Sequence, residues 1–214
     1  MNKYDRAYRD IADYFGNEPT EILAEHYRFI DKTRPVLDIG AGQGRNSIFL
    51  AREGYTVDAI DPSPVGLETI DRITAKEHLS IRTFPVGFEN FAADNAPYSA
   101  ILLFGVIQVL PRDKGDLLAE KVRQWLADGG LVFIAAFSTE DPSYGKSAAD
   151  GKSVGRNSFI SGDGEYHTYL EPDEILTLFS GFSVVYHRES MGKLHRHGNR
   201  PPHQHAEIIA VLRK

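Results

Sequence analysis

Cysteine is absent from the 214 residues of this chain. Without it, no disulfide framework or thiolate metal site can form, and no thiol can serve as a catalytic nucleophile. Long apolar runs are missing as well. No stretch approaches the roughly 20 apolar residues of a membrane span, and the polar residues 1–6 precede no apolar segment. We therefore expect a soluble, cytoplasmic protein.

Positive charge is in deficit. Lys and Arg number 24 against 30 Asp and Glu, a formal net charge of -6. A broad surface for phosphate groups is not expected, so we expect neither nucleic acid nor membrane as a partner, but a small molecule. A chain of this length, 42% hydrophobic, can bury one substantial core and is short for two. The prediction is one domain over residues 1–214.

The apolar spacing changes near residue 35. Before it, residues 3–15 and 20–31 have the periodicity of amphipathic helices, so residues 1–33 are expected to form an N-terminal helical cap. After it, short apolar runs alternate with amphipathic ones. Strands are predicted over 36–39, 56–60, 80–84, 99–104 and 131–137, and helices over 44–53, 64–76 and 113–127. Such alternation is typical of a parallel sheet covered on both faces.

The last third of the sequence has a different pattern. Strands are predicted near 182–188 and 205–212, and the polar segment between them is too short for a crossover helix, which favours an antiparallel hairpin. The predicted fold class is therefore α/β, with a doubly wound, mostly parallel seven-stranded sheet that ends in a C-terminal hairpin. Residues 138–163 are rich in Gly, Ser, Lys and Asp with little periodicity, and we expect a mobile loop there.

A glycine-rich segment follows the first predicted strand, and residues 36–44 read VLDIGAGQG. Glycines let a ligand approach the backbone, and the start of the following helix supplies unpaired N–H groups. Asp61, at the tip of the next strand, can accept both ribose hydroxyls of an adenosine. Three glycines alone also suit a plain tight turn, but the strand, helix and acid around them favour binding. The spacing differs from G-x-G-x-x-G, which favours a ligand without a pyrophosphate. Asp38 can anchor this loop or meet the cofactor's amino group through water.

These features resemble the class I S-adenosylmethionine-dependent methyltransferases. Residues 38–44, DIGAGQG, match their first motif, Asp61 matches their ribose acid, residues 126–130, LADGG, resemble the turn before their fifth strand, and the hairpin resembles their ending. The resemblance covers nearly the whole chain. It implies a Rossmann-like fold, S-adenosyl-L-methionine as cofactor, and cofactor contacts from Asp38, Gly40, Ala41, Gly42, Gly44, Asn46, Asp61, Pro62, Gly87, Phe88 and Phe104.

The sequence departs from that family at three positions. Gly87 stands where an acid often contacts adenine, so that contact is expected from backbone groups or from Phe88. Ser99 and Gln108 stand where Asp and His are common.

Two further segments narrow the resemblance. Residues 44–57 and the tail, MGKLHR at 191–196 with GNR at 198–200, are similar to the tellurite-resistance methyltransferase family, whereas residues 138–166 do not match it. This likeness implies His195 as a base near the acceptor, with Arg196 and Arg200 orienting an oxyanion. The expected acceptor is a small molecule, with an oxyanion or a sulfur, selenium or tellurium nucleophile as the first to test.

Histidines crowd the tail, where five of the eight fall in the last 28 residues. His195 with His197, and His203 with His205, have the i, i+2 spacing of one strand face, and imidazoles at such spacing can bind zinc, copper or nickel. We favour solvated or substrate-facing histidines, because no carboxylate or thiolate ligand set accompanies them, and we assign no metal ligand.

The aromatic stripe of the first helix has two interpretations. Its spacing is typical of core packing, but Tyr14 or Phe15 can also close over the methionine end of the cofactor. Two rival functions are kept as well. One is an NAD-type oxidoreductase, which would prefer a dinucleotide, and the other is a non-catalytic S-adenosylmethionine-binding protein.

Overall fold

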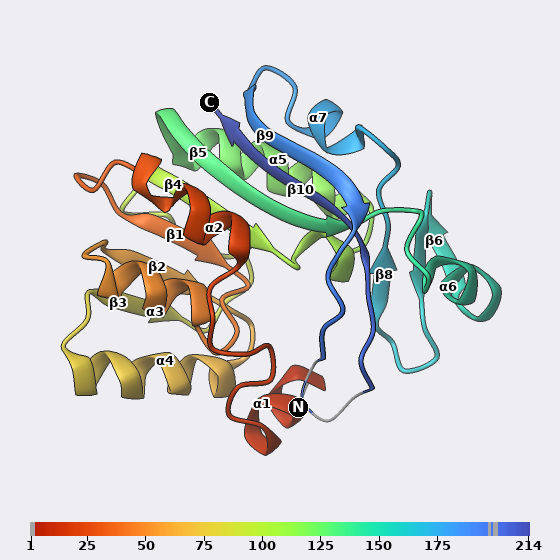
Figure 1. The fold of residues 1–214 in the computed structure, drawn as a ribbon, viewed down its shortest axis with the longest axis horizontal. Coiled ribbons are helices and arrows are strands. Elements are labelled where there is room, and N and C mark those ends of the chain that lie inside the picture. Colours follow the sequence, from red (N-terminus) through yellow and green to blue (C-terminus); the bar gives the residue numbers. More distant parts are fainter. Residues whose placement is uncertain (1–2, 197, 199–200) are drawn as a thin grey trace.

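The computed structural model describes residues 3–196, 198 and 201–214, which are built around a seven-stranded sheet (Figure 1). The strand order is β3-β2-β1-β4-β5-β10-β9. The first five strands are parallel, and β10 is antiparallel to both of its neighbours. The bounds are β1 Val36–Ile39, β2 Val57–Ile60, β3 Ile81–Phe84, β4 Tyr98–Phe104, β5 Leu126–Phe137, β9 Ser183–Met191 and β10 Ala206–Arg213. This topology confirms the predicted fold class, including the C-terminal hairpin.

Helices cover both faces of this sheet because its strands are apolar on both sides. Val36 and Leu102 belong to one buried cluster, with α2, α3 and α4, whereas Leu37 and Leu103 belong to another, with α5 and α7. The bounds are α2 Glu21–His26, α3 Arg45–Arg52, α4 Pro64–Glu77, α5 Asp113–Trp125 and α7 Glu174–Leu178. None of the helices in the described part of the chain combines the length and apolar character that a bilayer crossing requires.

The helical cap is shorter than its periodicity predicts. α1 spans Lys3–Asp10, and α2 gives way to a 3-10 turn, η1, at Tyr27–Phe29. The expected helix over residues 3–15 is wrong beyond Asp10. The helix ends early because of tertiary contacts. The Tyr14 amide donates to the side chain of Gln43, and the Ile11 carbonyl accepts from the same side chain. Bonds from another element replace the helical ones.

A second, three-stranded sheet stands where the sequence predicts a loop. It has the order β6-β7-β8, with β6 Lys152–Gly155, β7 Ser158–Ile160 and β8 Tyr166–Thr168, and α6 spans Tyr144–Asp150. The expectation that residues 138–163 lack regular structure is wrong, whereas their mobility stays a prediction. Tyr169 organises this unit: its ring packs edge-on against Tyr144 at 5.2 Å, and its hydroxyl bonds those of Ser143 and Ser147. Single aromatic anchors of this kind leave no periodic pattern in a sequence.

Candidate active site

The glycine turn, residues 40–44, connects β1 to α3 at the carboxyl edge of the sheet. Gly44 has a φ of +87° and Gly42 a φ of +56°, in the left-handed region that side chains disfavour. A Cβ at Gly44 would lie 2.4 Å from Cγ1 of Ile70, and one at Gly42 would lie 2.8 Å from the Tyr8 hydroxyl. Both positions therefore require glycine, and the turn presents bare backbone at the start of α3.

Asp61 joins the tip of β2 to this turn. One carboxylate oxygen accepts from the Gly42 amide at 2.8 Å, and the other accepts from the Ser63 amide at 2.7 Å. Burial raises the pKa of Asp61, although these two amides act in the opposite direction. A carboxylate has about four lone-pair sites, so two remain for a ligand. The expected ribose acid is thus also a brace for the turn.

Asp38 is buried beneath the turn, and the structure gives it the anchoring contact. The Ser47 hydroxyl donates to its Oδ2 at 2.6 Å, which joins β1 to α3. Burial raises the pKa of Asp38 to about 7, more than the Ser47 hydrogen bond lowers it. An acid that is half neutral near pH 7 beneath the turn makes this part of the fold sensitive to pH.

Gln43 holds the N-terminal cap over the turn. Its Oε1 accepts from the Tyr14 amide at 2.9 Å, and its Nε2 donates to the carbonyls of Tyr8 and Ile11 at 3.3 and 2.8 Å. Sequence reasoning missed this residue. Its one indication in the sequence is that an amide side chain stands between Gly42 and Gly44, where the turn itself does not require one.

The next two polar residues of α3 serve the same purpose. The Arg45 guanidinium donates to the Phe15 carbonyl at 3.0 Å, and Asn46 Oδ1 accepts from the Thr20 amide at 2.8 Å. Asn46, predicted as a cofactor contact, lines the cavity, and its side-chain carbonyl oxygen also contacts the cap. The glycine turn and the cap therefore form one unit.

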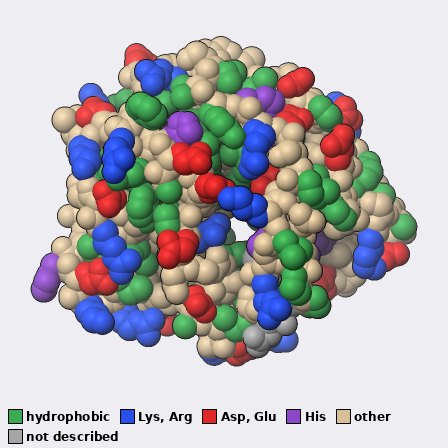
Figure 2. All heavy atoms as spheres, in the orientation of Figure 1, with side chains coloured by type: hydrophobic (Ala, Val, Ile, Leu, Met, Phe, Trp, Pro, Cys, Tyr) green, Lys and Arg blue, Asp and Glu red, His purple; other side chains and the backbone are tan. Residues whose placement is uncertain are grey.

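A cavity of about 1390 Å³ opens from this unit. Figure 2 shows the hollow from one face of the molecule, with charged side chains around its opening. Its walls include every predicted cofactor contact, together with His195 and Arg196. Its volume exceeds the several hundred Å³ of a usual ligand pocket, so a cofactor and an acceptor fit together.

Two buried polar atoms in this wall have no hydrogen-bond partner in the described part of the chain. They are the Thr20 hydroxyl and the Gln108 side-chain carbonyl, and both residues line the cavity. A buried polar atom left in this state costs about 1–3 kcal/mol, which a ligand with matching groups can recover. These atoms and the bare turn together fit a polar ligand such as the expected cofactor.

The segment after β3 supplies an acid that the sequence analysis overlooked. A Cβ at Gly87 would lie 2.9 Å from a carboxylate oxygen of Glu89, so Glu89 folds back to the position that lacks the usual acid. Glu89 and Gly87 both line the cavity, as does the mostly buried Phe88. The signal was present in the sequence as an acid two residues beyond the expected position.

The structure describes two of the three predicted acceptor residues, His195 and Arg196. His195 and Arg196 line the same cavity as the glycine turn, and His195 Nδ1 lies 2.9 Å from the Lys193 carbonyl oxygen. Arg200 and His197 lie outside the described residues. Tyr14 and Phe15 also line the cavity and pack edge-on against each other at 4.8 Å. Core packing and closure of the cavity are therefore compatible for these two rings.

Comparisons with known proteins agree with this arrangement. The family model of the tellurite resistance protein TehB matches residues 12–208. A probable S-adenosyl-L-methionine-dependent methyltransferase TehB of Haemophilus influenzae is 28% identical over 212 residues, covering 95% of this chain and 67% of that protein. A ubiquinone biosynthesis O-methyltransferase of Caulobacter sp. is 29% identical over 153 residues, covering 71% of this chain and 60% of that protein. This chain thus spans about two thirds or less of these relatives.

A solved structure repeats the fold. The crystal structure of TehB from Haemophilus influenzae superposes with a TM-score of 0.73 at 21% identity, covering 100% of this chain and 68% of that one. Neither a dinucleotide oxidoreductase nor a non-catalytic binding protein is favoured by these matches. The family model covers far more than half of this chain. The chain therefore belongs to the tellurite-resistance TehB family of S-adenosylmethionine-dependent methyltransferases.

Proposed function

We propose that this chain transfers the methyl group of S-adenosylmethionine to a small-molecule acceptor. One observation carries the proposal. The glycine turn, Asp61 and the pair His195 and Arg196 all line a single cavity, although they come from opposite ends of the chain. A cofactor end and an acceptor end in one enclosed space are what a transfer between two bound molecules requires.

The cofactor end is assigned to backbone and carboxylates. Amides of the glycine turn meet its polar groups, the two remaining acceptor sites of Asp61 meet its ribose hydroxyls, and Glu89 takes the place of the missing acid beside the adenine. Pro62, Phe88 and Phe104 supply apolar walls. Tyr14 and Phe15 exclude water at the other end, which strengthens each polar contact inside.

The acceptor end is assigned to the histidine and arginines of the tail. Bound S-adenosylmethionine supplies a methyl that is already electrophilic, so the protein mainly aligns the acceptor for attack. The Nδ1 hydrogen bond of His195 to the Lys193 carbonyl leaves Nε2 as the nitrogen that accepts the acceptor's proton. Arg196 and Arg200 orient a negatively charged acceptor. Oxyanions and sulfur, selenium or tellurium nucleophiles, as small anions, fit these charges.

Binding is tested by calorimetry with S-adenosylmethionine. We expect a single site, and Asp61→Ala is expected to weaken it by at least about 100-fold, because two hydrogen bonds to a charged group are lost at about 1.5–3 kcal/mol each. Asp128→Ala is the control, since this side chain is 98% exposed. Absence of heat from the wild type, or preference for NAD in competition, would overturn the proposal.

Transfer is tested with cofactor labelled on its methyl group. Tellurite, selenite, thiols and small carboxylates are offered as acceptors, and label in the acceptor is measured together with released S-adenosylhomocysteine. We expect both with at least one acceptor class. If the cofactor binds and no acceptor yields S-adenosylhomocysteine, the non-catalytic alternative is the better description.

A further inference from the structure

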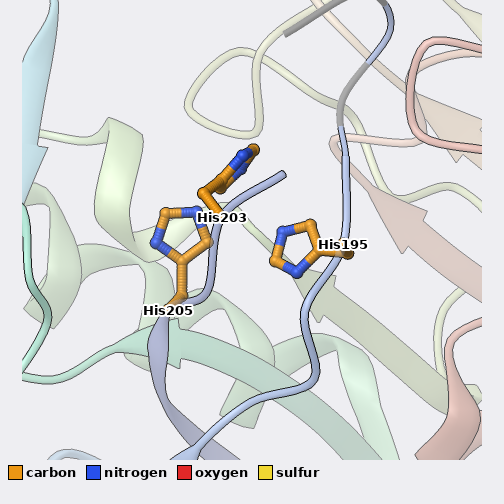
Figure 3. A group of neighbouring side chains, drawn as sticks. All are labelled: His195, His203 and His205. Atoms are coloured by element: carbon orange, nitrogen blue, oxygen red, sulfur yellow. The ribbon is translucent and has the colours of Figure 1, made fainter. Parts of the chain in front are cut away.

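Three histidines of the cavity wall lie together on two facing segments that we call the histidine arms, residues 192–196 and 201–205 (Figure 3). His195 and His203 form an antiparallel bridge, in which the amide of each donates to the carbonyl of the other at 2.9 Å. Residues paired in this way place their side chains on the same face, and His205 shares that face with His203 at i, i+2. The backbone therefore brings the three rings together.

The three rings are nearly equidistant. Their centroids are separated by 4.7 Å for His195 and His203, 5.1 Å for His203 and His205, and 5.4 Å for His195 and His205. One ring nitrogen of each lies within 4.8 Å of those of the other two. All three side chains are half-buried and line the cavity.

Each ring is oriented through the same nitrogen. Nδ1 of His195 lies 2.9 Å from the Lys193 carbonyl oxygen, and Nδ1 of His203 lies 2.9 Å from the Pro201 carbonyl oxygen. Nδ1 of His205 lies 2.8 Å from the Asp141 carboxylate. A carbonyl only accepts, so in the neutral rings Nδ1 carries the proton and Nε2 carries the lone pair. Three Nε2 lone pairs in one group match the protonation that metal ligation needs.

His205 has the support that metal-binding histidines usually have. Asp141 is 3% exposed and also accepts from the Ala206 amide at 3.0 Å, so its carboxylate is fixed behind the ring. On its flat side the ring stacks on Phe137, with centroids 4.0 Å apart. A carboxylate behind a histidine sets the orientation of the ring and increases its basicity toward a metal ion. The sequence analysis missed the Asp141 carboxylate, which orients the proposed ligand His205 and is not a ligand itself.

We propose that His195, His203 and His205 bind a divalent transition-metal ion such as Zn²⁺ through their Nε2 atoms, with a fourth position open to the cavity. Zinc–nitrogen bonds of about 2.0–2.1 Å in tetrahedral geometry place ligand nitrogens about 3.4 Å apart. Rotation of the three side chains has to reach this separation from a group in which one nitrogen of each ring lies within 4.8 Å of the others. Imidazole ligands suit zinc, copper and nickel, whereas magnesium and calcium prefer oxygen.

Ion binding needs neither cofactor nor acceptor, so this site can be tested separately from the proposed methyl transfer. The two proposals share one atom, the Nε2 of His195. That nitrogen accepts a proton in the metal-free protein and holds the ion in the metal-bound protein. A failure of zinc binding would leave the methyltransferase proposal untouched, and the reverse also holds.

The test is calorimetry of Zn²⁺ into the full chain without a polyhistidine tag, after treatment with a chelator. We expect one ion per chain. His203→Ala is expected to weaken binding at least 100-fold, whereas His78→Asn is expected to leave it unchanged, since His78 is an exposed residue at the end of α4 in a left-handed conformation that asparagine tolerates. Circular dichroism confirms that each variant is folded.

Asp141→Asn separates ligation from general folding. The amide can keep an acceptor for the Ala206 N–H but loses the charge behind His205, and an outer partner of this kind typically contributes about 10–100-fold in metal affinity. We also expect Co²⁺ to give the visible absorption of an imidazole-bound ion in the wild type and not in His203→Ala. Zinc affinity that is equal in the wild type, His203→Ala and His205→Ala, or absent from the wild type, would overturn the proposal.

Discussion

The glycine turn and the histidine arms both line one cavity and are built in different ways. The turn follows a fully buried strand, and its shape is fixed by left-handed glycines and by Asp61. The arms extend beyond β9 and β10, joined by the bridge of His195 and His203 and by a hydrogen bond from the Gly192 amide to the His205 carbonyl at 2.7 Å. The turn offers backbone to a ligand, whereas the arms offer side chains. Under the proposed function, cofactor recognition belongs to the core of the fold, and acceptor recognition belongs to segments added at its edge.

The largest effect should come from the turn. Gly44→Ala places a Cβ 2.4 Å from Ile70 Cγ1 at a φ of +87°, and we expect strain and overpacking to lower the free energy of unfolding by about 2–5 kcal/mol. Binding of S-adenosylmethionine should fall below detection in calorimetry. Gly115→Ala is the matched control, because its Cβ would meet nothing within 4 Å. Wild-type affinity in Gly44→Ala would break the contrast between the two regions.

A substitution in the histidine arms should lower the rate of methyl transfer and leave cofactor binding intact. His195→Gln removes the proposed base and should lower kcat about 100-fold or more, within the 10²–10⁴ typical of general bases, while cofactor affinity stays unchanged. The measurement uses chelator-treated protein, so that metal binding does not contribute, with His78→Asn as the control. A loss of cofactor affinity with unchanged kcat would show that His195 contacts the cofactor and does not act as the base.

The sequence predicts those features of the two regions that produce a local pattern of residues. The strands, the glycine turn and Asp61 follow from local patterns, and the predicted family and fold are confirmed. The site assignments for these residues stay predictions.

Other features depend on contacts that no local pattern records. Gln43 acts on residues 29 to 35 positions away, and the sheet around Tyr169 is held by aromatic packing. The histidine group arises only when the two arms pair. Spacing within one arm predicts its same-face pair, but not the partner across the bridge.

A smaller effect concerns the acid beneath the turn. Burial raises the pKa of Asp38 from 3.8 to about 7, so its contribution to stability is complete below the unfolded value and is lost as pH rises through the folded one. Asp38→Asn removes this titration. Between pH 5 and pH 8, the unfolding free energy of the variant should increase relative to wild type by on the order of 2–3 kcal/mol. Urea denaturation at both pH values measures it, and a constant difference would contradict it.

The smallest effect should come from the link between turn and cap. Gln43→Ala removes three hydrogen bonds to the cap, and we expect about a tenfold weaker affinity for the cofactor and faster amide hydrogen exchange in residues 4–15. Gln124→Ala is the control, since that exposed side chain donates a hydrogen bond to Glu120 within its own helix. Unchanged exchange would show that the cap does not depend on Gln43.

The most direct measurement is a crystal structure of the chain with S-adenosylhomocysteine. We predict the adenosine between the glycine turn and Asp61, with the ribose hydroxyls on the Asp61 carboxylate and the sulfur facing the end of the cavity that holds His195 and Arg196. An adenosine bound elsewhere, or a sulfur directed away from the histidine arms, would contradict the division of the cavity into a backbone end and a side-chain end.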